Sequence, residues 1–329
     1  MENKTLYLVI PCYNEESVLR ETAKQLNEKM KTMILKNYIS KNSKIMFVND
    51  GSKDSTWNII EDLNRNDPIF IGLKLSRNKG HQNALLAGLM DSKNCADMVI
   101  SLDADLQDDI NVIDSFVEEY YAGSDIVYGV RSKREKDTFF KRFTAESFYK
   151  FMKALGVDIV FNHADYRLMS KRALEALEQF KEVNLFLRGI IPLIGFKSSI
   201  VVYERNERFA GESKYPLKKM LNFAFEGITS FSVKPIRIIT TIGGIIFIIS
   251  TLFFIYSLIM KFLGKTVVGW TSIVCSIWMI GGIQLLCLGV IGEYIGKIYN
   301  EVKARPKYII EKRLSDNISS NNEKQKSTI

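Results

Sequence analysis

Short apolar runs alternate with amphipathic stretches from Leu6 to Val130. The apolar runs have the length of β-strands and comprise Leu6–Ile10, Ile45–Val48, Ile69–Leu75, Met98–Leu102 and Ile126–Val130. The stretches between them carry apolar residues at helical spacing and comprise Val18–Met33, Ser55–Asn64, Gln82–Asp91 and Asn111–Tyr121. This alternation predicts an α/β domain with a mostly parallel sheet covered by helices. Ligands of such domains bind beyond the carboxyl ends of the strands, so functional residues are expected there.

A further strand is predicted at Ser198–Tyr203, and two long stretches without a charged residue follow it, Ile238–Met260 and Thr266–Gly292. A helix needs only about 20 apolar residues to cross a bilayer. Helices buried in a large core are the alternative, but two such stretches so close together favour the membrane. We therefore predict transmembrane helices at residues 236–262 and 266–292. The preceding residues 216–235 mix apolar and charged side chains and are predicted to form amphipathic helices at the membrane interface.

The overall composition hides this uneven distribution. The chain has 329 residues, of which 47% are hydrophobic, and a mean hydropathy of −0.02, as in an average soluble protein. Half of the net charge of +8 lies from Lys297 onward, where eight Lys and Arg residues accompany four Asp and Glu residues. This tail, residues 297–329, either attracts anionic lipid headgroups or is a solvated, partly disordered segment.

The same charges predict the orientation in the membrane. Cations flank the outer ends of the two predicted spans more densely than the loop between them, which favours a cytoplasmic location for the soluble domain and the tail. No signal peptide is indicated, because Leu6–Ile10 is a short run that ends at Pro11. The sequence thus predicts a multi-pass protein of the cell (cytoplasmic) membrane, with its soluble domain in the cytoplasm and the lipid bilayer as a partner.

Polar clusters follow the first two predicted strands. The first is Pro11-Cys12-Tyr13-Asn14-Glu15, and the second runs from Asn49 through Asp50 and Ser52 to Thr56. A carboxylate on a turn after a buried strand can accept hydrogen bonds from a base or a ribose. Either cluster taken alone is explained equally well by an ordinary turn with a helix cap at Asp54 or Ser55.

A third cluster, Asp103-Ala104-Asp105-Leu106-Gln107, follows the fourth predicted strand. Two carboxylates on a chain that leaves a sheet are hard oxygen ligands, which suit a Mg²⁺ or Mn²⁺ ion that also holds a diphosphate. Such a pair is common by chance. Its position after an apolar strand, downstream of the other two clusters, favours a metal site.

The clusters PCYNE, VNDGSKDST and DADLQ, in this order and spacing, resemble those of the family 2 glycosyltransferases. Later segments narrow the resemblance to the polyprenyl-phosphate glycosyltransferases, which include bactoprenol glucosyltransferases and, more distantly, dolichyl-phosphate mannose synthases. These segments are Gly129-Val130-Arg131, Ala164-Asp165-Tyr166-Arg167-Leu168-Met169 and Arg205 to Tyr215. The resemblance runs from Leu6 to Tyr299. It implies a GT-A fold, which is a Rossmann-like α/β domain with a mostly parallel sheet, over residues 1–215.

The resemblance also implies roles for individual residues. The donor, a nucleotide sugar, would be bound by Pro11, Tyr13, Asn14, Glu15, Asp50, Ser52, Asp103, Arg205, Arg208, Ser213 and Lys214. The metal ligands would be Asp103, Asp105 and Gln107. The catalytic residues would be Asp165, Arg131 and Arg167, and the acceptor phosphate would be held by Arg131 and Arg142.

Physical reasoning questions one of these roles, that of Asp165 as a base. The nucleophile would be an oxygen of a lipid monophosphate, which is already largely ionised at pH 7 because its second pKa is about 6. An aspartate with an ordinary pKa of about 3.9 is a weak base for such a group. We therefore hypothesise that Asp165 chiefly orients the acceptor or Arg167 and removes a proton only from a monoanionic phosphate.

The resulting prediction is an inverting transfer of one sugar from a nucleotide-sugar donor to undecaprenyl phosphate at the cytoplasmic face, supplying lipid-linked sugar for cell-envelope glycosylation. UDP-glucose is the donor that the resemblance favours, with UDP-N-acetylglucosamine or GDP-mannose as alternatives. A processive polysaccharide synthase would need a Gln-x-x-Arg-Trp segment, which the sequence lacks. A non-catalytic membrane anchor or flippase partner with a retained fold is the alternative of a different class, although Asp103, Asp105 and Asp165 are all present.

Several other residues carry weaker signals. His81 and His163 lack metal-ligand spacing, and a polar role beside other site residues is the simpler interpretation for both. The four cysteines have no pairing or metal spacing and are interpreted as reduced and structural. Gly292 and Gly296 form a GxxxG pattern that fits either a homo-oligomer or chance. No motif supports nucleic acid as a partner, despite the basic charge.

Overall fold

The computed structural model describes residues 3–132, 163–183, 186–204 and 270–315, together with isolated positions between 236 and 263. The first part of the chain forms β1 (Leu6–Cys12), α1 (Leu19–Leu35), β2 (Lys44–Asn49), α2 (Thr56–Asn66), β3 (Phe70–Leu75), α3 (His81–Ser92), β4 (Met98–Ser101), η1 (Ile110–Val112), α4 (Ile113–Tyr121) and β5 (Ile126–Arg131). The remainder forms β6 (His163–Ser170), α6 (Lys171–Leu177), α7 (Leu187–Leu193), β7 (Ser198–Tyr203), α10 (Trp270–Lys303) and β8 (Ile310–Leu314).

The strands form one eight-stranded sheet in the order β7-β5-β6-β4-β1-β2-β3-β8. β1 is parallel to β2 and β4, β2 is parallel to β3, and β5 is parallel to β7. β6 runs antiparallel to both of its neighbours, β4 and β5, and β8 runs antiparallel to β3. The predicted α/β fold with a mostly parallel sheet is therefore confirmed. The sequence did not predict β6, α7 or β8.

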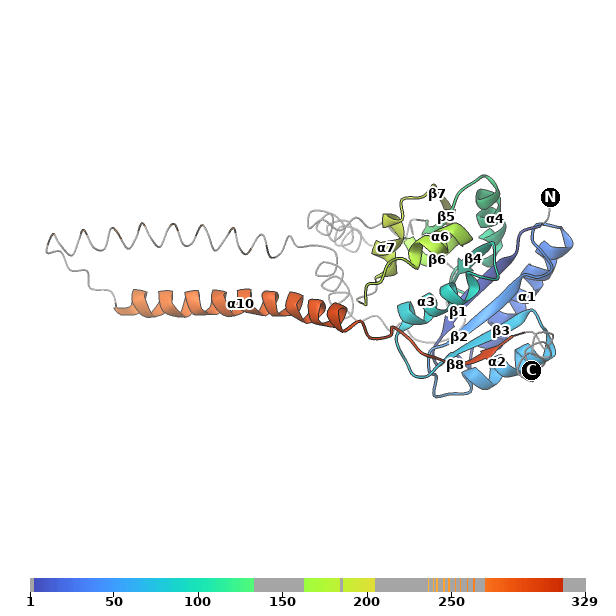
Figure 1. Ribbon diagram of the computed structural model, residues 1–329, viewed down its shortest axis with the longest axis horizontal. Helices are drawn as coiled ribbons and strands as arrows, with labels where there is room; N and C mark the ends of the chain where they lie inside the picture. The colour runs from blue at the N-terminus through green and yellow to red at the C-terminus, as the bar shows by residue number, and fades with distance from the viewer. Residues whose placement is uncertain are drawn as a thin grey trace, which may run out of the picture. The chain divides into compact units, whose positions relative to one another are not determined.

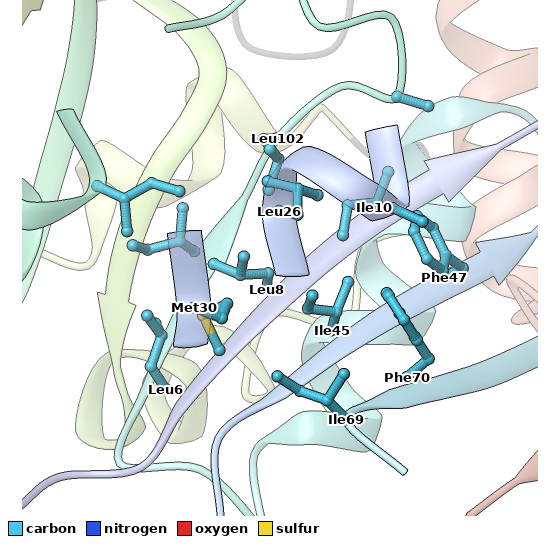
Figure 2. Packing of buried hydrophobic residues seen from close by; sticks show 14 of the residues in the cluster. Leu6, Leu8, Ile10, Leu26, Met30, Ile45, Phe47, Ile69, Phe70 and Leu102 are labelled. Atoms are coloured by element: carbon cyan, nitrogen blue, oxygen red, sulfur yellow. The ribbon is translucent and has the colours of Figure 1, made fainter. Parts of the chain in front are cut away.

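One face of the sheet is packed against α1. In this helix the apolar side chains Leu19, Ala23, Leu26, Met30 and Met33 recur at helical spacing, and all are buried. Figure 2 shows Leu26 and Met30 lying over Leu8 of β1. Because β1 is central and covered on both faces, it is a nearly continuous apolar run rather than an alternating one.

The opposite face is packed against α3, which comes unusually close to the strands at Gly88. A Cβ atom at this position would lie 2.4 Å from Cγ1 of Val9 and 2.7 Å from Cγ2 of Val48. Only glycine fits this contact without a shift of the strands or the helix. The close approach fixes the position of α3, whose first residue, His81, lies at the carboxyl edge of the sheet.

The strand β8 adds an edge to the sheet from a segment that the sequence assigned to the basic tail, residues 297–329. Its charged side chains form ion pairs with the domain: Lys312 with Glu61, Arg313 with Asp91, and Glu311 with Lys74. The sequence Ile-Glu-Lys-Arg-Leu does not look like a strand because its central residues are exposed and charged. Charged edge strands of this kind protect a sheet from pairing with other chains.

The helix α10 spans 34 residues and overlaps the second predicted transmembrane segment, residues 266–292 (Figure 1). It belongs to a second structural unit, separate from the unit that contains the sheet. Within the described part of the chain, no helix combines the length and the apolar character that a membrane crossing requires. The predicted interfacial segment, residues 216–235, and most of the first predicted span, residues 236–262, lie outside the described residues.

Candidate active site

The direction of the strands brings the predicted site residues to one edge of the sheet. The parallel strands β1, β2, β4 and β5 all end at this edge, and the antiparallel strand β6 begins there. The residues of all three polar clusters therefore converge, although they are separated by long stretches of sequence. Arg131 at the end of β5 and Asp165 near the start of β6 join them.

The loops after β1 and β2 are tied together by hydrogen bonds. The backbone N–H of Asn14 donates to the hydroxyl of Ser52 (3.0 Å), and the amide oxygen of Asn14 accepts from the backbone N–H of Lys53 (2.9 Å). The backbone N–H of Glu15 donates to the hydroxyl of Thr56 (2.9 Å). Pro11 lies within β1, and the side chain of Tyr13 stays exposed beside this pair of loops. The two loops predicted to hold the donor thus form one surface.

Asp50, at the end of β2, is buried, and its carboxylate binds backbone rather than solvent. It accepts hydrogen bonds from the N–H groups of Lys79 (2.7 Å) and Gly80 (2.9 Å) in the loop before α3. Burial raises the pKa of Asp50, although these two hydrogen bonds oppose the shift. In this structure Asp50 holds the loop that presents His81. Its predicted contact with the nucleoside stays a prediction.

The third cluster forms a tight loop after β4. The carboxylate of Asp105 accepts from the backbone N–H of Gln107 (3.2 Å), and Leu106 between them has a φ of 55°. Burial raises the pKa of Asp103 to about 6, His81 opposes the shift, and the negative charges of Asp108, Asp165 and Asp105 add to it. Such crowding of carboxylates is relieved by a cation.

The residues of this loop fit a divalent cation that is shared with a substrate. Among the described residues, no group of three or more His, Cys, Asp or Glu side chains is arranged to hold a metal by itself. Asp103 and Asp105 with the amide oxygen of Gln107 offer an incomplete set of hard oxygen ligands. Mg²⁺ and Mn²⁺ often complete such a set with water and substrate phosphate oxygens.

Asp165 lies at the centre of a cluster of cations. Arg188 of α7 forms a fork with its carboxylate, with Nε 3.2 Å from Oδ1 and Nη2 3.0 Å from Oδ2. Arg167 donates to Oδ1 from the same strand, and Nε2 of His81 lies 3.4 Å from Oδ2. Burial alone would raise the pKa of Asp165, but the His81 hydrogen bond and the charges of Arg188 and Arg167 outweigh it and hold the pKa well below its usual range.

Arg167, which was predicted to be catalytic, is placed inside the protein. Its side chain is 1% exposed, and its Nε and Nη1 atoms have no hydrogen-bond partner in the described structure. In the sheet it lies opposite Ser101 of β4 and Tyr128 of β5. In this position Arg167 contacts Asp165 and is shielded from solvent, so the geometry suits it to orient that carboxylate.

Arg131 takes part in a second charged network. Its Nη2 lies 3.2 Å from Oδ1 of Asp108, and its Nε donates to the hydroxyl of Tyr203 (3.2 Å). The hydroxyl of Tyr203 in turn donates to the same Oδ1 of Asp108. Asp108 directly follows Gln107, so this network joins the end of β5 to the loop of residues 103–108, which we call the acidic loop.

Three contributors to the site were missed by the sequence reasoning, and one was undervalued. Asp108 adjoins the DADLQ cluster, and this adjacency was the only signal for it. Arg188 and Tyr203 lie in or beside apolar segments whose pattern carried no functional signal. His81 was interpreted as a neighbouring polar residue, and the structure places it between Asp103 (3.7 Å) and Asp165. The predicted residues Arg142, Arg205, Arg208, Ser213 and Lys214 lie outside the described residues.

The fold and this site define an α/β enzyme whose polar residues meet at the carboxyl edge of a mostly parallel sheet. The sequence model of the family described as "Glycosyl transferase family 2" matches residues 7–178. The chain therefore belongs to glycosyltransferase family 2 and is a glycosyltransferase. The family resemblance seen in the sequence is confirmed.

Individual proteins are similar over nearly the whole chain. The protein YkoT of Bacillus subtilis strain 168, an uncharacterized glycosyltransferase, is 56% identical over 93% of this chain and 91% of its own. The bactoprenol glucosyl transferase of Shigella phage SfII is 44% identical over 93% of this chain and 97% of its own. Among solved structures, glucosyl-3-phosphoglycerate synthase of Mycobacterium tuberculosis has 15% identity and a TM-score of 0.45, covering 69% of this chain and 79% of that one.

The pairing of Asp165 leads to a prediction about pH. A carboxylate already bound by two guanidinium groups is a poor base, so Asp165→Asn should slow transfer through lost orientation. The size of the defect should then stay constant from about pH 5 to about pH 8, across the second pKa of a phosphate acceptor near 6. Initial rates of both proteins over this range test the prediction. A defect that shrinks as the pH rises would show that Asp165 removes a proton.

Arg188 leads to a second prediction. Arg188→Gln removes the forked contact to Asp165 and should lower kcat about ten- to a hundredfold, the effect expected for charge-assisted hydrogen bonds. Arg172→Gln is a matched control, because Arg172 also pairs with an aspartate, Asp125, but its side chain is 64% exposed. Steady-state kinetics and melting temperature should be measured for both. Equal kcat values for the two variants would remove Arg188 from the site.

Proposed function

We propose that this glycosyltransferase moves one glucosyl residue from UDP-glucose to undecaprenyl phosphate at the cytoplasmic face of the membrane. The observation that carries the proposal is the similarity to proteins described as bactoprenol glucosyl transferases, from Shigella phages SfII and SfV, over 93% and 97% of this chain. Bactoprenol phosphate and undecaprenyl phosphate are the same acceptor. Such a similarity, over the catalytic domain and the C-terminal segments together, supports a shared acceptor as well as shared chemistry.

The site supports the chemistry of this transfer. In an inverting displacement, an oxygen of the acceptor phosphate forms a bond to C1 of the sugar, and the bond from C1 to the donor's diphosphate breaks. The electron pair of the broken bond leaves with the nucleoside diphosphate. Mg²⁺ or Mn²⁺, when bound at Asp103, Asp105 and Gln107, would act as a Lewis acid for that leaving group.

The cationic side chains of the site would serve the two phosphate groups. The attacking phosphate needs no strong base, because it is already largely ionised. Arginine suits forked contacts to phosphate oxygens, and Arg131 at the edge of the sheet is the arginine that we assign to the acceptor phosphate. The network of Arg188, Arg167 and Asp165 would keep the reacting groups aligned. Alignment of this kind is a large part of the rate enhancement in reactions between two bound substrates.

We further propose that residues 236–262 and 266–292 cross the cell membrane and keep the catalytic domain on the cytoplasmic side. The support comes from the two uncharged stretches of sequence and from the apolar side chains that α10 exposes. Those exposed side chains include Ile273, Ile277, Ile280, Ile283, Leu288 and Ile291. Exposure of so many large apolar groups to water is unfavourable, whereas lipid would cover them. Anchoring there would bring the domain to an acceptor whose tail stays in the bilayer.

A transfer assay tests the proposed function. Purified full-length protein in detergent is incubated with undecaprenyl phosphate, Mg²⁺ or Mn²⁺ and, in separate reactions, UDP-glucose, UDP-N-acetylglucosamine or GDP-mannose. We expect acceptor-dependent release of UDP with UDP-glucose and loss of turnover after chelation of the metal. Release with another donor would reassign the sugar. No release with any donor would favour the non-catalytic anchor.

The same assay, applied to an Asp103 variant, distinguishes an enzyme from a non-catalytic anchor. Asp103→Ala should lower turnover by a factor on the order of a hundred, because the leaving diphosphate loses its metal. Asp62→Ala is the control, since Asp62 is an exposed aspartate that binds Arg20 and Asn66 at the surface. Unchanged turnover in the Asp103 variant would exclude the predicted metal site.

Membrane insertion is tested at the centre of the second span. Ile280→Arg places a charge where translocation scales assign a cost of about 3 kcal/mol, and Ile280→Leu is the matched control. We expect the wild type and the leucine variant to stay in the membrane pellet after alkaline carbonate extraction and the arginine variant to be depleted from it. A wild-type protein that is fully extracted by carbonate would falsify the two-span proposal.

A further inference from the structure

The side-chain contacts around Asp108 are buried, and they converge on one oxygen of its carboxylate. Oδ1 of Asp108 receives both the guanidinium of Arg131 and the hydroxyl of Tyr203, whereas Oδ2 is buried and has no hydrogen-bond partner within the described residues. The residue is only 3% exposed. A buried carboxylate is costly unless it is paired, so Arg131 and Tyr203 are the groups that stabilise its charge.

The ring of Tyr203 is fixed by its packing. It makes an edge-to-face contact with Tyr166 (centroids 5.3 Å apart), which in turn packs edge-to-face on Phe116 (4.7 Å). Gly129 in β5 leaves room for this arrangement, because a Cβ there would lie 3.1 Å from the Tyr203 ring and 2.8 Å from the carbonyl oxygen of Tyr166. Gly129 therefore lets the Tyr203 ring pack closely against β5. Arg131, two residues after Gly129 in this strand, lies beside the ring.

Burial, with the charge and the hydrogen bond of Asp108, raises the pKa of Tyr203 above its usual value. The hydroxyl therefore stays protonated and continues to donate to Asp108. In the same network Arg131 keeps a side chain that is 25% exposed, at the edge of the sheet where Asp103 and Asp165 also lie. The guanidinium is thus held at two of its nitrogens and still reaches the surface of the site.

An arginine held in this way is preorganised for an anion. A free arginine side chain loses conformational freedom when it binds phosphate, and that loss reduces affinity. The contacts from Asp108 and Tyr203 restrict the Arg131 side chain before the ligand binds. They also fix the orientation of the planar guanidinium, on which forked recognition of phosphate depends.

We infer that Asp108 and Tyr203 are positioning residues that hold Arg131 toward the phosphate of the lipid acceptor. The inference rests on the proposed function, since it assumes a phosphate acceptor at Arg131. The competing explanation is that the network merely stabilises the acidic loop. The two explanations differ in which substrate is affected, because a distorted acidic loop would weaken the donor and its metal, whereas a misplaced Arg131 would weaken the acceptor.

The test measures KM for each substrate separately in full-length Asp108→Asn and Tyr203→Phe proteins. Asparagine can keep the oxygen that accepts both hydrogen bonds while a neutral amide replaces the charged carboxylate, and phenylalanine removes only the hydroxyl. We expect each variant to raise the acceptor KM about tenfold, the effect of weakening one charge-assisted hydrogen bond. The donor KM and the Mn²⁺ concentration for half-maximal activity should match those of the wild type.

Asp125→Asn is the matched control. Asp125 immediately precedes β5 at the end opposite to Arg131, and its carboxylate likewise binds an arginine and a hydroxyl, those of Arg172 and Ser170. This variant should leave both KM values unchanged. The double variant of Asp108 and Tyr203 adds a further criterion, because residues of one network have non-additive effects. We expect its acceptor KM to rise by clearly less than the product of the two single effects.

The outcomes are distinguishable from failure of the proposed function. If the wild type transfers sugar to undecaprenyl phosphate but the variants keep their acceptor KM, the positioning role is wrong and the proposed function stands. A larger change in donor KM or metal dependence than in acceptor KM would likewise overturn it in favour of loop stabilisation. If the wild type transfers nothing to this acceptor, the proposed function fails and the inference fails with it.

Discussion

The negative charge gathered at the carboxyl edge of the sheet is the constraint on which the site depends. Four aspartates of the described structure, Asp103, Asp105, Asp108 and Asp165, meet there, and like charges so close together repel one another. The protein compensates two of them with arginine. Asp165 is bound by Arg167 and Arg188, and Asp108 is bound by Arg131.

Asp103 differs from Asp108 and Asp165 in its charged partners. Within the described residues it forms no ion pair with a lysine or arginine, its nearest cationic group is His81, and the pKa of its carboxyl is raised to about 6. A carboxylate left in this condition has most to gain from a divalent cation that enters with a substrate. Within the described residues, the arginine pairs thus leave Asp103, at the start of the acidic loop, as the carboxylate that would gain most from the predicted metal.

The reversed strand β6 makes the Asp165 cluster possible. Because it runs against β4 and β5, its first residues lie beside their last residues, and Asp165 reaches the edge where Asp103 leaves the sheet. The same register buries Arg167 between two strands, which an arginine tolerates only with a partner such as Asp165. A parallel strand at this place would have put Asp165 at the opposite edge, away from the site.

The parts of this arrangement that could be predicted from sequence are those with a strong periodic signal. Apolar runs such as Leu6–Ile10 identified the parallel strands, and strand order along the chain implied that their polar ends would converge. β6 was missed because Asp165 and Arg167 interrupt its apolar pattern, and the pairing that compensates their charges in the folded protein is not visible in that pattern. β8 was missed because its backbone ladder with β3 and its ion pairs, such as that of Lys312 with Glu61, join it to residues more than two hundred positions away. Contacts between distant residues of this kind leave no local pattern.

The acidic loop connects the predicted metal ligands to the arginine proposed for the acceptor phosphate. Asp103 and Asp105 at its start are the predicted metal ligands, and Asp108 at its end holds Arg131, which is proposed to bind the acceptor phosphate. The loop is short and is fixed internally by the contact of Asp105 with the backbone of Gln107. The ion pair between Asp108 and Arg131 then sets the position of the guanidinium proposed for the acceptor relative to the metal site predicted on this loop. An arrangement held by the protein's own contacts needs no ordering when the substrates bind, and a reaction between two bound substrates gains most from groups that are already aligned.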